Sequence, residues 1–416
     1  MRYARIMAAT LAVWAVGFPA RAGLLWDAET AGGHPITVRG EGVPFNPASV
    51  VKIGTTWFAL ERLGPEHRYV TTFGYTGTLD RRRGRLDGTL AVAGGSDPDF
   101  QVENALRVTR ALNAKGVRKV SGGLTITGSF WMGWEGGPFR RKSSRTARLL
   151  LAGQRLRRAM NPALWNAALW KTWRELAHRH GWDVARPPGI VIDGPTRVSG
   201  SVHSVALVVH RSNPLRVILK RFDVFSNNDI ERIADPLGGA PAVQAFVRDA
   251  LGDRSGRVQL ETACGEGVNR MTARLVVRML VRFRRALARF GLEPRDLLPV
   301  PGCDPGPVPV MFPKLARGRL ARAVVCKTGT LSSTDGGVAV VAGFFETPDG
   351  HSIVFCVAAP RAGEGLHRWR QREQRWLLRL IRREGGAVRR VCGAPFVLSD
   401  QFATVQPVPG PGRRSP

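Results

Sequence analysis

The stretch Asn46-Pro47-Ala48-Ser49-Val50-Val51-Lys52 places a serine three residues before a lysine at the predicted start of a helix. Residues i and i+3 lie on the same face of a helix, so the Ser49 hydroxyl and the Lys52 ammonium can meet. A lysine that is desolvated near other positive charge loses its proton more easily, and a neutral amine beside a hydroxyl can make a serine a nucleophile. The same spacing also arises by chance, so the rest of the chain has to decide between the two interpretations.

Two further motifs support the catalytic interpretation: Ser226-Asn227-Asn228 and Lys327-Thr328-Gly329. The patterns Ser-x-x-Lys, Ser-x-Asn and Lys-Thr-Gly each occur once in the chain. They are predicted to lie at a helix start, in a loop and at a strand edge, in the order that serine acyl-enzyme chemistry of this kind requires. Each motif is weak alone, but together they predict one catalytic site.

The side chains of these motifs have distinct expected roles. Ser226 can relay a proton, and Asn228 can bond both the Lys52 side chain and a substrate amide. The N–H of Ser49 and the N–H beyond Gly329 can form an oxyanion hole. A lysine and hydroxyls at a strand edge can bind a substrate carboxylate. We therefore expect a catalytic set of Ser49, Lys52, Ser226, Asn228 and Lys327, and a substrate-binding set of Thr328, Gly329 and Thr330.

The predicted elements divide the chain into one domain interrupted by another. Residues 23–70 contain short strands and the helix that begins at Ser49, and residues 205–392 contain strands and two long amphipathic helices. Between them, residues 71–204 alternate short β-like runs with turns, which is typical of a strand-rich inserted domain. The Pro/Gly-rich segment 393–416 is expected to be a partly disordered tail.

Basic residues dominate the charge of the chain. Its 416 residues include 62 Lys and Arg against 32 Asp and Glu, a net charge of +30, and 44% of them are hydrophobic, as in globular proteins. Such a charge favours anionic partners. The arginines are scattered, however, and neither an aromatic RNA-binding signature nor zinc-finger spacing accompanies them. We expect no nucleic-acid partner and at most a weak association with an anionic surface or membrane.

The first 22 residues have the features of an export signal. Arg2 and Arg5 precede the apolar run Ile6–Phe18, and Ala20-Arg21-Ala22 supplies a small-x-small cleavage pattern. The apolar run is short for a membrane span. We expect residues 1–22 to be a signal peptide that directs the protein to the periplasm or another extracytoplasmic compartment. An uncleaved N-terminal anchor is the alternative.

The cysteines and histidines show no metal-ligand spacing, so no metal site is expected. One or two disulfides can form in an oxidising compartment, with at least one thiol left over, although buried apolar cysteines are the simpler expectation. The five cysteines are Cys264, Cys303, Cys326, Cys356 and Cys392.

With these motifs the chain resembles the class C low-molecular-mass penicillin-binding proteins, the D-alanyl-D-alanine carboxypeptidase/endopeptidase family of peptidoglycan. The resemblance implies an α/β, penicillin-binding (serine β-lactamase/transpeptidase-like) fold, in which an antiparallel sheet flanked by helices is split by the inserted domain. The long separation of Ser49 from Ser226 suits this family better than β-lactamases. The resemblance covers most of residues 23–385, through the stretches 46–52, 59–65, 90–98, 226–231, 269–274 and 327–331.

The resemblance also implies an activity, that of a serine-type D-Ala-D-Ala carboxypeptidase. Ser49 would attack the D-Ala-D-Ala bond of peptidoglycan stem peptides while Lys52 takes its proton, and water would then hydrolyse the acyl-enzyme. Lys327, Thr328 and Thr330 would hold the terminal carboxylate and the oxyanion. β-Lactam antibiotics would acylate the same serine, and no cofactor is implied. The sequence does not separate carboxypeptidase from D,D-endopeptidase action.

Two segments depart from the pattern of that family. Residues 261–267, Glu-Thr-Ala-Cys-Gly-Glu-Gly, stand where the family has an Asp-Gly-Ser-Gly-Leu-Ser-like segment, and residues 302–306 replace a Gly-x-Asp-Gly-Thr-like stretch. The nucleophile and the base are intact, but the positions of these loops bear on substrate choice and turnover. The alternative function is therefore that of a catalytically impaired, peptidoglycan-binding homologue.

Overall fold

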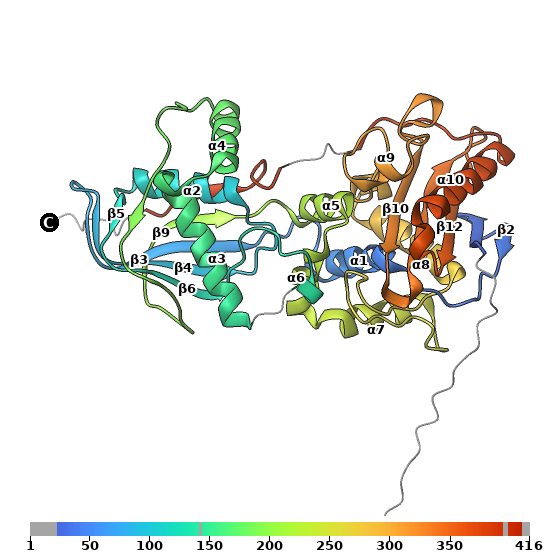
Figure 1. Cartoon of the computed structure of the whole chain (residues 1–416), viewed down its shortest axis with the longest axis horizontal. Coiled ribbons are helices and arrows are strands. Elements are labelled where there is room, and N and C mark those ends of the chain that lie inside the picture. Colours follow the sequence, from blue (N-terminus) through green and yellow to red (C-terminus); the bar gives the residue numbers. More distant parts are fainter. Residues whose placement is uncertain (1–22, 141–143, 394–397, 410–416) are drawn as a thin grey trace, which may run out of the picture.

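The computed structural model of the chain describes residues 23–140, 144–393 and 398–409 (Figure 1). The predicted signal peptide, residues 1–22, lies outside the described residues. Two lobes lie side by side along the long axis of the molecule, one built on a five-stranded sheet and the other on an eight-stranded sheet (Figure 1). Within the described part of the chain, no helix is both long and apolar enough to cross a membrane.

The five-stranded sheet is antiparallel throughout, in the order β10-β11-β12-β1-β2. Alternate side chains of β11 point to opposite faces, and both sets are apolar: Val340 and Phe344 belong to one core, Val341 and Phe345 to another. A sheet that is apolar on both faces needs a cover on each. Helix α8 packs on one face and α10 on the other. The bounds are β1 Leu25–Thr30, β2 Pro35–Arg39, β10 Val324–Leu331, β11 Val338–Glu346, β12 Ser352–Pro360, α8 Ala273–Arg289 and α10 Leu366–Arg383.

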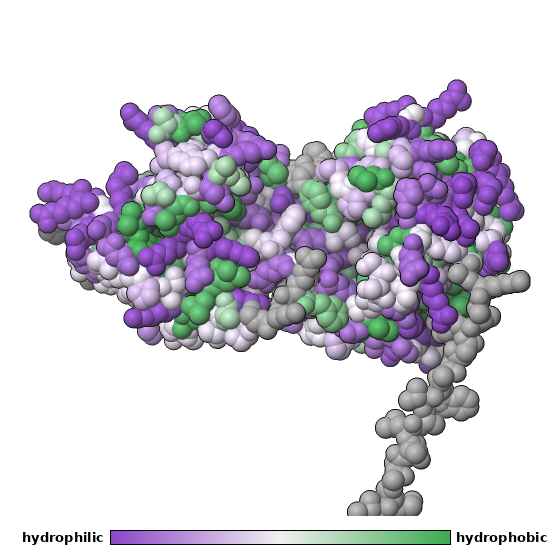
Figure 2. Space-filling model, viewed as in Figure 1, coloured by the Kyte–Doolittle hydropathy of each residue, from purple (hydrophilic) through white to green (hydrophobic). Residues whose placement is uncertain are grey.

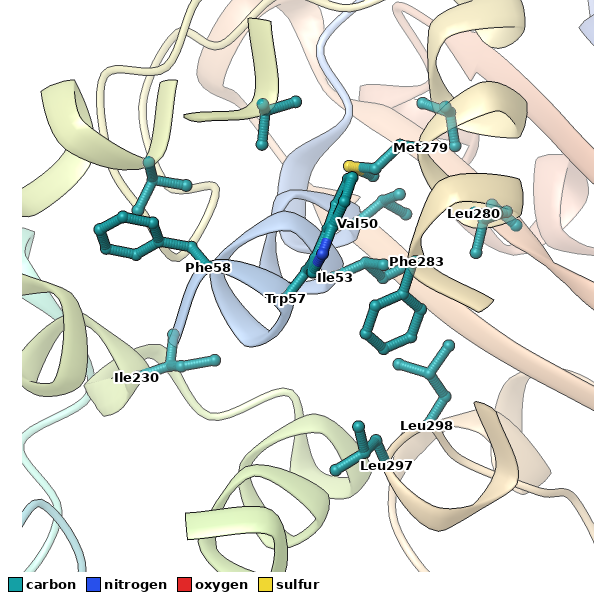
Figure 3. Close-up of a cluster of buried hydrophobic side chains, with 14 of the residues drawn as sticks. Val50, Ile53, Trp57, Phe58, Ile230, Met279, Leu280, Phe283, Leu297 and Leu298 are labelled. Atoms are coloured by element: carbon teal, nitrogen blue, oxygen red, sulfur yellow. The ribbon is translucent and has the colours of Figure 1, made fainter. Parts of the chain in front are cut away.

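Helix α1 (Val51–Leu63) is the central helix of this lobe and is buried along most of its length. Figure 3 shows apolar side chains of α1 and α8 facing each other in the core. Gly54 permits their close approach, because a Cβ there would lie 3.0 Å from Val247 and 3.3 Å from the Met279 sulfur. Packing on all sides fixes the N-terminus of α1. The other helices of this lobe are α5 Leu215–Phe225, α6 Glu231–Ala234, α7 Gly239–Leu251 and α9 Pro307–Met311.

The second lobe interrupts the first between α1 and α5. Its sheet runs β13-β9-β3-β4-β5-β7, with β6 pairing β4 and β8. β3 and β4 form a long antiparallel hairpin, whereas β5 and β6 run parallel to β4 after the crossover helix α2. The antiparallel sheet flanked by helices and the strand-rich insert are thus confirmed. The bounds are β3 Val70–Asp80, β4 Arg85–Gly95, α2 Val102–Ala114, β5 Lys119–Val120, β6 Leu124–Ser129, α3 Arg145–Met160, α4 Ala167–His180, β7 Val191–Ile192, β8 Thr196–Val198, β9 Val205–Arg211 and β13 Thr404–Pro407.

Two strands of this sheet lie outside the expected range 71–204. β9 pairs with β3, so the chain leaves the inserted lobe only after Arg211, and the boundary expected at residue 205 is too early. The expected tail, residues 393–416, contains β13, which pairs with β9 at the sheet edge. A Pro-rich composition hides such a strand, but an edge position tolerates Pro407, which has no N–H to donate.

One disulfide joins Cys303, in the loop before β10, to Cys392, after α10. The remaining three cysteines, Cys264, Cys326 and Cys356, are free and buried. The expectation of buried apolar cysteines therefore holds for three of the five. The disulfide links the segment that leads into β10 to the segment that follows α10.

Candidate active site

Ser49 lies in the short 3₁₀ turn η1 (Ala48–Val50) that leads into α1. Ala48 has a φ of +46°, and its N–H donates a 3.0 Å hydrogen bond to Asn46 Oδ1. Asn46 Nδ2 in turn donates to the Gly267 carbonyl at 2.8 Å. A non-glycine residue at positive φ costs about 1–3 kcal/mol and persists only where its surroundings hold it. The turn that carries Ser49 is therefore fixed by tertiary contacts as well as by α1.

Lys52, one helical turn after Ser49, is fully buried. Its Nζ lies 2.8 Å from Ser49 Oγ, 2.7 Å from Asn228 Oδ1 and 2.6 Å from the Cys264 carbonyl oxygen. Burial lowers the pKa of Lys52 below its usual range, while nearby acidic groups, among them Asp223, act in the opposite direction. This lysine therefore loses its proton more readily than a surface lysine.

The three neighbours of Lys52 Nζ match the hydrogen-bonding capacity of a neutral amine. Such an amine has two N–H groups, which Asn228 Oδ1 and the Cys264 carbonyl can accept, and one lone pair. The lone pair then faces the Ser49 hydroxyl. The geometry suits the transfer of the hydroxyl proton from Ser49 to Lys52, with no histidine needed.

The Cys264 carbonyl belongs to the unusual loop 261–269, which internal hydrogen bonds hold in place. The buried Asn269 side chain accepts from the Glu261 N–H at 2.9 Å and donates to the Glu266 carbonyl at 2.8 Å. The Cys264 N–H donates to the Glu231 carboxylate at 3.0 Å. The loop thus presents a backbone carbonyl to Lys52 from a fixed position.

Gly265 brings this loop against the turn that carries Ser49. It has a φ of +84°, and a Cβ added to it would lie 2.0 Å from the Ala48 carbonyl oxygen. That distance is far inside van der Waals contact, and both partners are backbone. Only glycine fits here without displacing the turn or the loop.

Glu266, the next residue, adds a carboxylate to the site. Its Oε1 accepts a 2.8 Å hydrogen bond from Asn228 Nδ2, while Asn228 Oδ1 accepts from Lys52. These two bonds fix the orientation of the Asn228 amide. They also link a partly exposed negative charge to the buried lysine through one side chain.

Ser226 and Lys327 form a second pair. Ser226 ends α5 in the left-handed conformation, with a φ of +53°, and its Oγ accepts a 2.8 Å hydrogen bond from Lys327 Nζ. Burial lowers the pKa of Lys327 to about 7, and the positive charge of Lys52 contributes in the same direction. Buried Asp223 opposes this shift, and its own pKa is raised by burial to about 6. Lys52 thus adds to the effect of burial in lowering the pKa of Lys327.

Gly329 and Thr330 follow Lys327 on β10, the edge strand that borders the Ser49 turn. A Cβ on Gly329 would lie 2.5 Å from the Pro47 carbonyl oxygen, so the absence of a side chain permits this approach. The Thr330 hydroxyl and the Gly329 carbonyl both accept hydrogen bonds from Arg370 of α10, the latter at 2.6 Å. Arg370 is buried and pairs with buried Glu373 at 2.7 Å. Through Arg370, this ion pair supports the β10 strand from the side of α10.

The inserted lobe reaches the same site through Asp229, the residue after Asn228. Its buried carboxylate accepts the N–H groups of Glu135, Gly136 and Gly137 at 2.6, 3.2 and 3.3 Å. Arg232 continues the contact by donating to the Gly133 carbonyl at 3.0 Å. A loop of the insert is thereby pinned beside the Ser226–Asn228 segment.

One ion pair, one cation–π contact and one hydrogen bond add to this contact between the lobes. Arg221 of α5 lies 3.3 Å from the Asp99 carboxylate and 5.0 Å from the Trp134 ring centroid. Trp134 Nε1 also donates to Asp99 Oδ1 at 3.2 Å. Burial raises the pKa of Asp99 to about 6, and Arg221 opposes that shift. The insert therefore docks on the helix that ends at Ser226.

The structure brings the predicted site residues into two contiguous groups. Ser49, Lys52 and Asn228 meet directly, and Ser226 meets Lys327. Thr328 is buried beside Lys327, and Gly329 lies against the Ser49 turn. The sequence interpretation did not anticipate that the Thr330 hydroxyl would contact Arg370. It also did not assign Cys264, Glu266, Asp229, Arg370 or Glu373 to the site, although residues 261–267 were noted as a departure.

No group of three or more His, Cys, Asp or Glu side chains with the geometry of a metal site occurs among residues 23–140, 144–393 and 398–409. The groups at the candidate site are instead two buried lysines, two serines, an asparagine and a carboxylate. That set can carry out proton transfer and nucleophilic attack, and it can bind an anionic ligand.

A protein-family model matches two long parts of the chain. It describes the D-Ala-D-Ala carboxypeptidase 3 (S13) family and matches residues 21–139 and 188–374. These ranges contain the Ser-x-x-Lys, Ser-x-Asn and Lys-Thr-Gly motifs. The segment between them contains α3 and α4 of the inserted lobe.

Solved structures share the fold at low sequence identity. The predatory endopeptidase Bd0816 of Bdellovibrio bacteriovorus, in complex with the immunity protein Bd3460, is 22% identical with a TM-score of 0.73, covering 91% of this chain and 99% of that one. The penicillin G-acylated endopeptidase Bd3459 of the same organism, also in complex with Bd3460, is 20% identical with a TM-score of 0.70, covering 92% and 99%. Penicillin-binding protein 4 of Haemophilus influenzae, complexed with a β-lactam, is 17% identical with a TM-score of 0.62, covering 87% and 97%.

Proposed function

Since the chain belongs to the D-Ala-D-Ala carboxypeptidase 3 (S13) family of serine peptidases that act on peptidoglycan, we propose that it cleaves D-Ala-D-Ala stem peptides through an acyl-enzyme on Ser49. One observation carries the assignment of the nucleophile. Lys52 Nζ is buried and lies 2.8 Å from Ser49 Oγ, while its other two contacts are acceptors. Lys52 is therefore the base that this serine needs.

In the acylation step, the Ser49 hydroxyl gives its proton to neutral Lys52 as Oγ attacks the carbonyl carbon of the penultimate D-Ala. Lys327, as an ammonium, binds the terminal carboxylate at the β10 edge, and the Ser49 and Thr330 N–H groups stabilise the oxyanion. The C–N bond then breaks, and the proton held by Lys52 passes through Ser226, which the Lys327 contact holds in place, to the departing amine, so that Lys52 is neutral again.

In the deacylation step, a water molecule attacks the ester carbonyl and gives a proton to Lys52. The bond between the acyl carbon and Ser49 Oγ breaks, and Oγ regains its proton from Lys52, which restores the free enzyme. Asn228 and the Cys264 carbonyl keep Lys52 Nζ beside Oγ in both steps. β-Lactams, whose amide and carboxylate mimic the substrate, would acylate Ser49 and stop at this ester.

The test is covalent labelling with a fluorescent penicillin, read by gel and by intact mass. We expect one equivalent of label on the wild type and none on Ser49→Ala. Ser255→Ala removes an exposed hydroxyl elsewhere and should label as the wild type does. Labelling of Ser49→Ala at the wild-type rate would show that another residue is the nucleophile.

The alternative, a peptidoglycan-binding homologue with impaired catalysis, arises from loop 261–269. Its support is the replacement of the usual segment; against it stands the Cys264 carbonyl, which still contacts Lys52 at 2.6 Å. Release of D-alanine from a muramyl pentapeptide separates the two functions. Parallel incubation with a D,D-cross-linked muropeptide dimer would show whether the protein also acts as an endopeptidase.

We also propose that the protein works outside the cytoplasm, where peptidoglycan is found. The support is the sequence of residues 1–22, which has the features of an export signal, and the location of the proposed substrate outside the cytoplasm. Expression with its own N-terminus in a Gram-negative host, followed by fractionation and intact-mass analysis, tests this. An unprocessed chain in the cytoplasmic fraction would contradict it.

A further inference from the structure

The outer face of α10 carries a continuous stripe of arginines. The helix is 18 residues long, about 27 Å, and its inner face packs on the sheet through Trp376, Leu377 and Leu380. Figure 2 shows hydrophilic side chains over this part of the first lobe. The exposed arginines of the stripe are Arg368, Arg372, Arg375, Arg379, Arg382 and Arg383.

These arginines are little neutralised by the protein. The one carboxylate within α10, Glu373, is fully buried and pairs with Arg370 on the inner side. Among the ion pairs of the described residues, only Arg383 of the six has a partner, Glu384. An anionic surface opposite this helix face would lower its self-repulsion.

Tryptophans accompany the arginines. A hollow of about 360 Å³ beside α10 is lined by Trp26, Trp369 and Trp376, together with Arg372 and other arginines of the stripe. The Arg372 guanidinium lies 4.5 Å from the Trp369 ring centroid. Tryptophan is enriched where a protein meets the headgroup region of a bilayer, because one part of the ring is apolar and another donates a hydrogen bond.

The start of the described chain lies in the same hollow, because Gly23 and Leu24 line it. The apolar run Ile6–Phe18 precedes Gly23 by five residues, a reach of at most about 17 Å. A membrane that receives the apolar run during export is thus within reach of the α10 face. This proximity selects a lipid surface over other polyanions as the partner.

We propose that the α10 stripe and the adjoining half-buried Trp26 and Trp369 bind the protein peripherally to an anionic phospholipid bilayer. The Ser49 turn and α1 pack with the core on the opposite face of the sheet. Bound through α10, the protein keeps its candidate active site directed away from the lipid. The proposal is independent of catalysis, because none of its residues contacts Ser49, Lys52 or Lys327.

The test is co-sedimentation with vesicles of phosphatidylcholine and phosphatidylglycerol at 7:3, against pure phosphatidylcholine, in 0.05–0.3 M NaCl. The triple variant Arg372→Gln, Arg375→Gln, Arg379→Gln should bind the anionic vesicles on the order of 100-fold more weakly, from the contribution of each basic residue near such a surface. The matched control is Arg278→Gln, Arg282→Gln, Arg285→Gln, which removes the same charge from the exposed face of α8. The affinity of this control variant for the anionic vesicles should fall by less than about threefold.

Wild type and variants are purified identically, so any contribution of residues 1–22 is common to all, and far-UV circular dichroism reports on folding. Absence of binding to anionic vesicles, or equal losses in the two triple variants, would overturn the proposal. Displacement by soluble polyphosphate at equal charge concentration would assign the face to an anionic polymer instead. Failure of penicillin labelling with vesicle binding intact would count against the proposed catalysis alone.

Discussion

Replacement of Arg370 by methionine is expected to destabilise the protein and to disturb the Lys-Thr-Gly edge together. The guanidinium is buried and donates to the Val340 carbonyl at 3.0 Å, the Gly329 carbonyl at 2.6 Å and Glu373 at 2.7 Å. Methionine has a similar length, so the loss is chiefly one of charge and hydrogen bonds. Removing one partner of a buried ion pair costs about 3–5 kcal/mol, because the other charge stays buried.

Glu373 limits that cost. Burial raises its pKa to about 7 even with Arg370 present, so the orphaned carboxyl will take up a proton in the variant at neutral pH. The Gly329 and Val340 carbonyls would lose the hydrogen bonds from Arg370, at about 1.5–3 kcal/mol for each bond to a charged group. We therefore expect Arg370→Met to lower the free energy of unfolding by about 3–5 kcal/mol. Acylation should slow as well, because Gly329 and Thr330 lose their hydrogen bonds from Arg370.

Urea unfolding and the rate of penicillin labelling measure the two effects. Arg370→Met combined with Glu373→Met removes both charges and should recover the part of the lost stability that comes from the orphaned carboxyl. Arg368→Met, an exposed arginine of the same helix, should change neither quantity measurably. A single variant within about 1 kcal/mol of the wild type that labels normally would refute the reasoning, and so would a double variant no more stable than the single one.

Three further predictions concern the site and its supports. Because burial lowers the pKa of Lys327 to about 7, between about pH 7 and 10.5 the unfolded chain binds this proton and the folded chain does not. The contribution of Lys327 to the free energy of unfolding therefore rises with pH over that window. The rate of acylation by a carboxylate-bearing β-lactam should fall over the same window, and Lys327→Arg should flatten that fall in stopped-flow profiles from pH 6 to 9. Gly265→Ala puts a Cβ 2.0 Å from the Ala48 carbonyl oxygen, so we expect acylation to slow by at least about tenfold. The control Gly252→Ala, also at positive φ but with open space around it, should be acylated at the wild-type rate. Equal acylation rates for the two variants would contradict this prediction. The double variant Cys303→Ser, Cys392→Ser removes the disulfide between residues 89 apart in sequence, which should lower the free energy of unfolding by about 4 kcal/mol while penicillin still labels the protein. The same urea midpoint as the oxidised wild type would argue against a stabilising disulfide.

The local part of the site was predictable because helix geometry determines it. Ser49 and Lys52 are one turn apart, so their contact follows from the spacing alone. The contacts of Lys52 with Asn228 and of Ser226 with Lys327 join residues far apart in the sequence, and only the motifs with their resemblance to a family pointed to them. The covers on both faces of the sheet likewise follow from strands such as β11, which are apolar on both faces, whereas the antiparallel arrangement was implied by the resemblance to a family.

The remaining features could not be predicted because no side-chain pattern marks them. Lys52 bonds the backbone carbonyl of Cys264, and a carbonyl is present at every residue. Arg370 resembles the other arginines of α10 in sequence and differs only in facing the sheet. Asp229 holds the N–H groups of Glu135 and Gly136 across the boundary between lobes, a contact that depends on how the insert docks. Each of these contacts is settled by tertiary packing.

The strand β13 has a consequence for the order in which the protein is made. The sheet that begins with Val70 gains its last strand from residues 404–407, near the end of the chain. Until those residues have left the ribosome or the export channel, β9 presents an open edge that can pair with another chain. A product that stops short of Thr404 should therefore self-associate, which size-exclusion chromatography of a chain ending at residue 393 would detect, whereas in a full-length chain β13 covers β9.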